Sequence, residues 1–156
     1  MRYLDRFSAA DVILDVTASN KAGLLEFLAT EVAQRHGLAV QSVLDALKAR
    51  EQIGSTALGQ GIALPHAEPR SAESPAILCA RLSRPIDFDA EDDQPVDLVF
   101  VVLWPPANRK GLLNAVSEIC GALRDPQALR RLRAVANRQE VAQIVREAAP
   151  SAAEEE

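Results

Sequence analysis

The sequence predicts a single-domain α/β fold, in which one mixed β-sheet of about five strands is flanked by helices on both faces. Three observations predict this class. The chain has 156 residues, 48% of them hydrophobic, which fits one domain with a sizeable core. Apolar residues recur with helical spacing towards both ends of the chain. Between these parts the apolar segments are short and rich in β-branched residues, as strands are.

The first part of the chain predicts one strand followed by two helices. Residues 12–16 form a short apolar strand, and Ser19 is the expected N-cap of the first helix. Apolar residues at near-helical spacing continue this helix until Gly37, because a glycine favours a helix end. A second helical pattern covers residues 40–49 and places Arg50 at its C-terminal end.

The middle of the chain predicts the remaining strands. They cover residues 61–64, 76–82 and 96–104, and the last of these segments is almost continuously apolar. A strand of that composition is buried on both faces of its sheet. The Pro105-Pro106 pair ends it, because proline has no N–H group to donate to a neighbouring strand.

The last part of the chain returns to helices. The first of them begins near Arg109. The Asp125-Pro126 pair indicates an N-cap followed by proline at the first helical position of the next helix. A final helix begins at Asn137, whose spacing to Glu140 is typical of a capping box.

We expect the folded domain to span residues 1–149, and residues 150–156 to form a disordered acidic tail. Two cysteines, Cys79 and Cys120, lie in apolar surroundings without a metal-binding or redox spacing. We therefore expect both to be buried as small hydrophobic side chains.

Charge and composition argue against several classes of partner. The 17 Lys and Arg residues are outnumbered by 22 Asp and Glu residues, whereas a general nucleic-acid binder needs a basic face. The N-terminus has no uninterrupted apolar segment of the signal-peptide type, and no apolar run is long enough to span a bilayer. No Cys, His or Asp cluster has the spacing of metal ligands. We expect a cytoplasmic protein that binds no nucleic acid, membrane, metal or other cofactor.

His66 is the main chemical candidate. The chain has only two histidines, and imidazole can act as an uncharged nucleophile or as an acid and base near neutral pH. His66 follows Pro65 just past a glycine-flanked apolar strand, where a polar loop is expected, and Arg50 is close enough in sequence to fold back on that loop. A neutral imidazole beside a guanidinium suits phosphoryl transfer, because the ring nitrogen attacks phosphorus while the planar cation stabilises the phosphoryl oxygens.

Each candidate also has a purely structural interpretation. His66 taken alone is more typical of a histidine that caps a strand end and hydrogen-bonds a carbonyl group. Arg50 can cap the C-terminus of its helix, and this role is compatible with binding phosphate. The hydroxyls of Ser55 and Thr56 are candidate donors to phosphate oxygens, with a turn-forming role as an equal alternative. Asp97, at the start of a buried strand, is expected to be satisfied by local backbone donors.

The chain resembles a known family in the segments around His66. These segments are Arg50-Glu51, Gly54-Ser55-Thr56, Gly59-Gln60-Gly61-Ile62-Ala63-Leu64-Pro65-His66, Pro85-Ile86-Asp87-Phe88 and Asp92-Asp93-Gln94-Pro95-Val96-Asp97-Leu98-Val99-Phe100. They are similar to the IIA domain of the fructose/mannitol class of the bacterial phosphotransferase system. In a chain without attached transporter domains, the similarity is greatest to the free-standing nitrogen-regulatory IIA proteins. It spans about residues 12–145.

The resemblance implies a cytoplasmic phosphocarrier with the IIA fold. His66 stands at the position of the family's active histidine, which accepts a phosphoryl group from a phosphorylated HPr-like donor, and Arg50 matches the arginine that steadies the phosphate. In regulatory members the phosphorylation state is the output. It is read by protein targets such as a sensor kinase or a component of a potassium transporter.

One position departs from the family. Members usually carry a second histidine near the start of the helix that follows the long buried strand, and Leu112 stands there in this chain. The other histidine, His36, is far from His66 in sequence. Three functions therefore compete: a regulatory phosphocarrier, an interaction module that keeps the fold but works unphosphorylated, and an unrelated hydrolase with His66 as its base. The hydrolase needs a nucleophile or metal ligands that the sequence does not show.

Overall fold

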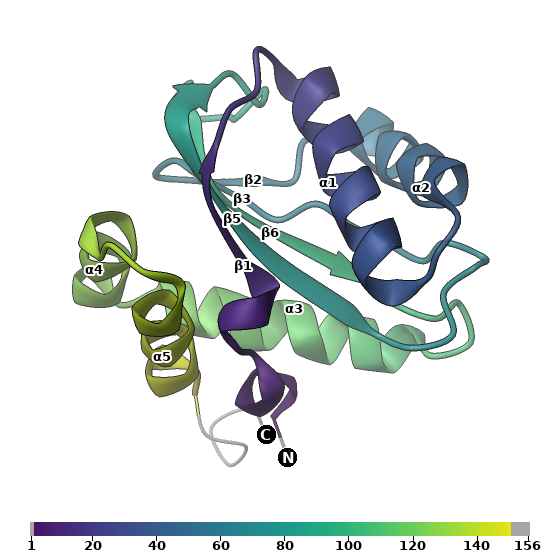
Figure 1. The fold of residues 1–156 in the computed structure, drawn as a ribbon. Coiled ribbons are helices and arrows are strands. Elements are labelled where there is room, and N and C mark those ends of the chain that lie inside the picture. Colours follow the sequence, from purple (N-terminus) through teal and green to yellow (C-terminus); the bar gives the residue numbers. More distant parts are fainter. Residues whose placement is uncertain (1, 151–156) are drawn as a thin grey trace.

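The computed structural model describes residues 2–150, which form one six-stranded mixed sheet between two layers of helices (Figure 1). The predicted α/β class is confirmed. The strands are β1 (Val12–Val16), β2 (Ala57–Gly59), β3 (Ile62–Ala63), β4 (His66–Ala67), β5 (Ala76–Ile86) and β6 (Val96–Leu103). Their order is β1-β5-β6-β3-β2, and β4 also pairs with β6. The pairs β5–β6 and β2–β3 are antiparallel, and the others are parallel.

The helices divide between the two faces of the sheet. On one face lie α1 (Lys21–His36) and α2 (Val40–Ile53), and on the other lie α3 (Arg109–Leu123), α4 (Pro126–Ala134) and α5 (Arg138–Ala148) (Figure 1). Two short 3-10 helices, η1 (Tyr3–Arg6) and η2 (Ala9–Asp11), precede β1. None of the helices within residues 2–150 combines the length and the hydropathy that a bilayer crossing requires.

The central strand β6 confirms the prediction of a strand buried on both faces. Leu98, Phe100 and Val102 belong to the apolar cluster of α3, α4 and α5, whereas their neighbours Val99 and Val101 belong to the cluster of α1 and α2. This alternation follows from the period of two in a strand. β6 is therefore a rigid support for any segment that pairs with it.

Several predicted boundaries were wrong. The N-cap of α1 is Asn20 rather than Ser19, because the Asn20 side chain accepts a hydrogen bond of 2.8 Å from the amide of Gly23. Helix α2 runs on to Ile53, since no glycine or proline interrupts it before Gly54, so Arg50 lies within its last turn. The loop expected at His66 is instead a two-residue strand, because that segment pairs with β6.

The β2–β3 hairpin, which precedes His66, was not predicted as a pair of strands. Gln60 and Gly61 turn the chain with positive φ angles of 57° and 80°. A carboxylate oxygen of Asp92 accepts a hydrogen bond of 2.9 Å from the Gln60 amide, and this bond is the main cause that lowers the pKa of Asp92. Asp97 pairs with Arg133 of α4 at 2.9 Å, which corrects its predicted satisfaction by local backbone groups.

The other helix caps and the cysteines follow the predictions with one correction. Asp125 caps α4 and Asn137 caps α5, each through its side chain. Cys79 is buried, and burial raises the pKa of its thiol to about 12. Cys120 is only partly buried and packs against the apolar cluster of α3, α4 and α5. Of the predicted tail, only Pro150 belongs to the described residues, and residues 151–156 lie outside them.

Candidate functional site

The backbone around His66 is fixed by the central strand. β4 runs parallel to β6, with His66 opposite Val102. The amide of Val102 donates to the carbonyl of Pro65 at 2.9 Å. The side chain of His66 is half-buried, whereas the next residue, Ala67, is buried. The fold therefore holds the histidine on a rigid segment while it leaves one side of the ring accessible.

The hydrogen bond of the imidazole identifies its free nitrogen. Nδ1 of His66 lies 2.8 Å from the carbonyl oxygen of Leu64. A carbonyl oxygen only accepts hydrogen bonds, so in the neutral ring Nδ1 carries the proton and Nε2 carries the lone pair. The strand-end hydrogen bond expected for a structural histidine is therefore present, and it leaves the lone pair of Nε2 available.

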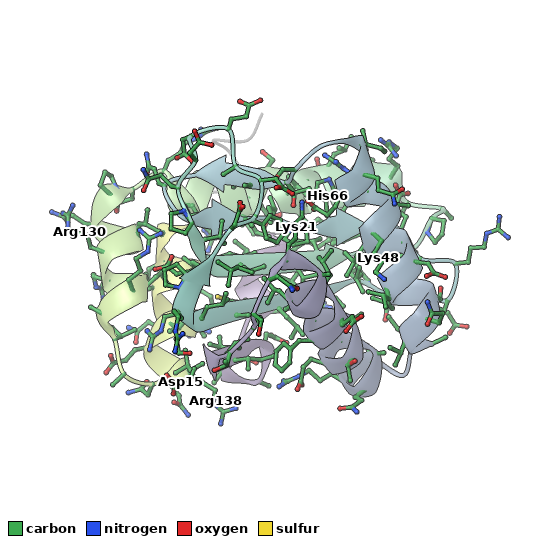
Figure 2. All side chains as sticks on the ribbon, turned by 90° about the horizontal axis from the view of Figure 1, so that it is seen from above. Asp15, Lys21, Lys48, His66, Arg130 and Arg138 are labelled. Atoms are coloured by element: carbon green, nitrogen blue, oxygen red, sulfur yellow. The ribbon has the colours of Figure 1, made fainter. Side chains whose placement is uncertain are left out.

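His66 opens into a cleft of about 300 Å³ between α2 and α3. We call the two sides the α2 wall and the α3 wall. The α2 wall consists of Ala46, Ala49, Arg50 and Ile53, the α3 wall consists of Arg109, Leu112 and Leu113, and the floor consists of His66, Ala67 and Glu68. Figure 2 shows His66 near the middle of the molecule in that view, whereas Arg130 of α4 projects from its left edge.

Arg50 and His66 line the same cleft, as their combination in the sequence predicted. Nη1 of Arg50 donates to the carbonyl oxygen of Gly54 at 3.0 Å, which caps the end of α2. A guanidinium has five N–H donors, so this cap leaves donors for a second acceptor. The two roles considered for Arg50 are geometrically compatible.

Ser55 and Thr56 do not line this cleft, and their hydroxyl protons have acceptors elsewhere. The Ser55 hydroxyl donates to the carbonyl of Phe88 at 2.6 Å. The Thr56 hydroxyl donates to the carboxylate of Glu51, which also accepts from the Thr56 amide at 3.1 Å. These contacts favour the turn-forming alternative, and binding of phosphate by either hydroxyl stays a prediction that needs a change of partner.

Glu51 connects the end of α2 to α1 and to the segment of Thr56. Its buried carboxylate lies 3.0 Å from Nζ of Lys21 on α1, and Lys21 also stands over the Phe88 ring, 4.5 Å from the centroid. The sequence analysis quoted Glu51 only as part of a motif. Its partner Lys21 comes from another helix, and no local spacing connects the two residues.

Two charged residues of the cleft were missed in the sequence. Nη1 of Arg109 lies 3.0 Å from Oε1 of Glu68. The Arg109 side chain is 73% exposed and that of Glu68 is 22% exposed. One signal could have found Glu68: it is two residues after His66 in an extended segment, where alternate side chains share a face.

The rim of the cleft is apolar on both sides. Ile53 of α2 is 83% exposed and Leu113 of α3 is 56% exposed. Leu112, which the sequence analysis aligned with the family's second histidine, is buried and lines the same cleft as His66. His36 ends α1 and is absent from the lining of this cleft. The site thus has one imidazole, two guanidinium groups, one carboxylate and an apolar rim.

Comparison with known proteins places the chain in a family. The sequence model described as "Phosphoenolpyruvate-dependent sugar phosphotransferase system, EIIA 2" matches residues 6–148. The chain is 34% identical to a nitrogen regulatory protein of Bradyrhizobium diazoefficiens, over 93% of this chain and 95% of the relative. It is 38% identical to a nitrogen regulatory protein of Klebsiella oxytoca, over 85% of this chain and 83% of the relative.

A solved structure agrees with these sequence relatives. The crystal structure of the nitrogen regulatory protein IIA-Ntr from Neisseria meningitidis superposes with a TM-score of 0.85 at 29% identity, over 91% of this chain and 97% of the other. Sequence and fold are thus similar over almost the same residues. The chain belongs to the type 2 EIIA family of the phosphoenolpyruvate-dependent phosphotransferase system.

Proposed function

We propose that the protein is a regulatory phosphocarrier of a nitrogen-type phosphotransferase system, which accepts a phosphoryl group on Nε2 of His66 in the cytoplasm. One observation carries the proposal. The hydrogen bond from Nδ1 to the Leu64 carbonyl, at 2.8 Å, leaves Nε2 free at a cleft that also contains Arg50. The nitrogen regulatory proteins among its relatives support the regulatory role.

The transfer step exchanges one bond for another. The Nε2 lone pair of His66 attacks the phosphorus of the phosphorylated donor, and the bond between phosphorus and the donor breaks with its electron pair returning to the donor. The Leu64 carbonyl accepts the Nδ1 proton in a hydrogen bond while the bond to Nε2 forms, so positive charge develops on the ring during transfer. A cationic ring is a good leaving group, and the phosphoryl group therefore stays transferable.

Arg50 stabilises the charge on the phosphoryl oxygens. Its guanidinium is held near the end of α2 by the Gly54 carbonyl, so little reorganisation is needed when the phosphoryl group arrives. A planar fork of donors suits the bidentate geometry of phosphate better than the point charge of lysine does.

The apolar rim favours a protein as donor. Exposed Ile53 and Leu113 stand on opposite sides of the histidine, where a phosphorylated HPr-like protein could bury them on docking. After transfer, the phosphorylated and free forms present different charge at this surface. Protein targets such as a sensor kinase or a component of a potassium transporter would distinguish the two forms by binding.

A second candidate function is an interaction module that works unphosphorylated. The observation in its favour is Leu112, which offers the cleft neither a hydrogen-bond donor nor an acceptor. Under this alternative, targets would bind the same apolar rim, and His66 would serve only to fix the strand end.

Phosphorylation by an energised HPr-like donor separates the two candidates. The protein is incubated with the donor, and the site of the added mass is mapped in the wild type, in His66→Ala and in the matched control His36→Ala. We expect one added phosphoryl group on His66 in the wild type and in His36→Ala, and none in a folded His66→Ala variant. An unmodified wild type would favour the interaction module, and modification that persists in His66→Ala would exclude His66 as the acceptor.

A further inference from the structure

We propose that Glu68 and Arg109 form a charge switch at the His66 site, in which Arg109 pairs with Glu68 in the free protein and moves to the phosphoryl group after transfer. Arg109 then acts as a second phosphate-binding residue, supplied by the α3 wall. This inference rests on the proposed phosphorylation of His66 and adds a residue that the family motif around His66 does not contain.

The geometry brings the three groups into one cleft. Burial alternates along the segment of His66 and Glu68, with buried Ala67 between two half-buried side chains, so His66 and Glu68 share a face. Arg109 lines the same cleft from α3 and already reaches Glu68, with Nη1 and Oε1 3.0 Å apart. A guanidinium that already contacts the residue two positions beyond His66, on the same face, is well placed to approach a group on Nε2.

The charges determine the direction of the switch. A phosphoryl group carries about two negative charges near neutral pH, whereas a carboxylate carries one. Attached to His66, it would stand on the same face as Glu68 and repel that carboxylate. It would also offer Arg109 three acceptor oxygens. Arg109 therefore has a better partner in the phosphorylated state than in the free state.

The ion pair of Arg109 and Glu68 contributes little to folding stability, so Arg109 can change its partner at little cost to the fold. With 73% of its side chain exposed, Arg109 forms a pair of the kind that contributes little to folding stability. Arg50, by contrast, is tied to the Gly54 carbonyl at 3.0 Å. Of the two guanidinium groups of the cleft, that of Arg109 thus belongs to the more exposed residue.

Arg109 does not stabilise the N-terminus of its own helix, α3. The first turn of α3 contains no acidic residue and begins with Arg109 and Lys110, although negative side chains are the ones that stabilise a helix N-terminus. Leu112, three residues further on the same helix face, offers no hydrogen bond. On the α3 wall, Arg109 is therefore the side chain that can bind a phosphoryl oxygen.

The test compares four variants by their rate of phosphorylation from an HPr-like donor. They are Arg109→Ala, Glu68→Gln, the double variant, and Lys110→Ala as the matched control for loss of a cation outside the cleft lining. We expect Arg109→Ala to slow phosphorylation by about tenfold, as the loss of one phosphate ligand does, and Lys110→Ala to match the wild type. We expect Glu68→Gln to be as fast as the wild type or faster.

The double variant shows whether Arg109 binds the phosphoryl group or only neutralises the charge of Glu68. If Arg109 binds the phosphoryl group, the double variant stays slower than Glu68→Gln; if Arg109 only neutralises Glu68, the two are equal and the proposal is overturned. The Arg109 Nε resonance should also shift on phosphorylation, and an unmoved resonance would contradict the switch. A wild type that is not labelled on His66 rejects the proposed function and the switch together. A labelled wild type with an equally fast Arg109→Ala rejects the switch alone.

Discussion

The two walls of the His66 cleft are built differently. The α2 wall carries Arg50, whose guanidinium is tied to the end of its own helix by the Gly54 carbonyl. The α3 wall carries Arg109, whose guanidinium is exposed and paired with Glu68 across 41 positions of sequence. A half-buried arginine and an exposed one thus line the same cleft as the imidazole. Under the proposed function, the difference predicts that the α2 wall supports the transfer chemistry and that the α3 wall adjusts it.

The α2 wall also has a buried ion pair behind it, which joins α2 to α1. Glu51 links the end of α2 to Lys21 of α1 and to the backbone of Thr56. On the α3 wall, Leu112 packs as an apolar residue in the position where the family usually has a histidine. The comparison therefore predicts large effects from changes in the α2 wall and smaller effects from changes in the α3 wall.

The largest effect is expected at Arg50. Arg50→Lys keeps the charge but loses the planar fork, so phosphorylation of His66 should slow by about ten- to a hundredfold, roughly 1.4 to 3 kcal/mol of transition-state stabilisation. The measurement is the rate of transfer from an HPr-like donor. Lys48→Ala, an exposed change on the same helix, is the control. An unchanged rate in Arg50→Lys would show that Arg50 is only a helix cap.

A stability effect is expected from the support beneath the α2 wall. Glu51→Gln removes the negative charge that faces Lys21 at 3.0 Å, in a place where the Glu51 side chain is only 5% exposed. Loss of a buried partner of this kind costs about 2 kcal/mol, and a chemical denaturation curve measures it. Glu31→Gln, which removes an ion pair with Arg35 at 3.3 Å on the surface of α1, should change the unfolding free energy by less than about 0.5 kcal/mol. Equal unfolding free energies for the two variants would contradict the supporting role of Glu51.

A smaller effect is expected at Leu112. An imidazole at this place can hydrogen-bond the phosphoryl group, which leucine cannot do, so Leu112→His should speed discharge to a IIB acceptor by roughly three- to tenfold. Asn114→His adds the same group to an exposed position of α3 outside the cleft lining and should have no effect. Discharge by the wild type that is no slower than by Leu112→His would contradict the regulatory interpretation.

The smallest change is expected in thiol chemistry. Burial raises the pKa of both thiols, that of Cys79 to about 12, so each has less reactive thiolate than a free cysteine at the same pH. Cys120, which is partly buried on α3, should react slowly with iodoacetamide and faster as the pH rises towards 9. Cys79 should react only after unfolding. Labelling of Cys79 in the native protein near pH 7 would show that the core around β5 opens.

Sequence reasoning succeeded where the determining contacts are local. The apolar run of β6 gave a strand buried on both faces, and the spacing of Arg50 and His66 gave two residues that line one cleft. The caps at Asp125 and Asn137 were equally local. These features depend on periodicity or on neighbours within a few residues, which the sequence displays directly.

It failed where the partner comes from another element. β4 exists because His66 and Ala67 pair with β6, a contact that no propensity of two residues predicts. The pair of Glu68 and Arg109 and the pair of Asp97 and Arg133 join segments that are 41 and 36 positions apart. For Ser55 and Thr56 the sequence left a phosphate-binding and a turn-forming role open, because the acceptors of their hydroxyls, the Phe88 carbonyl and the Glu51 carboxylate, could not be identified from the sequence.

The most direct test of the central claim is to identify the phosphorylated nitrogen. The protein, labelled with ¹⁵N in its histidine rings, is loaded from an energised HPr-like donor and observed by correlation of the ring protons with the ring nitrogens. Because Nδ1 of His66 is held by the Leu64 carbonyl at 2.8 Å, the phosphoryl group should appear on Nε2 of His66, and the His36 ring should be unchanged. A phosphoryl group on Nδ1, a modified His36, or rings that stay unmodified after loading would contradict the account.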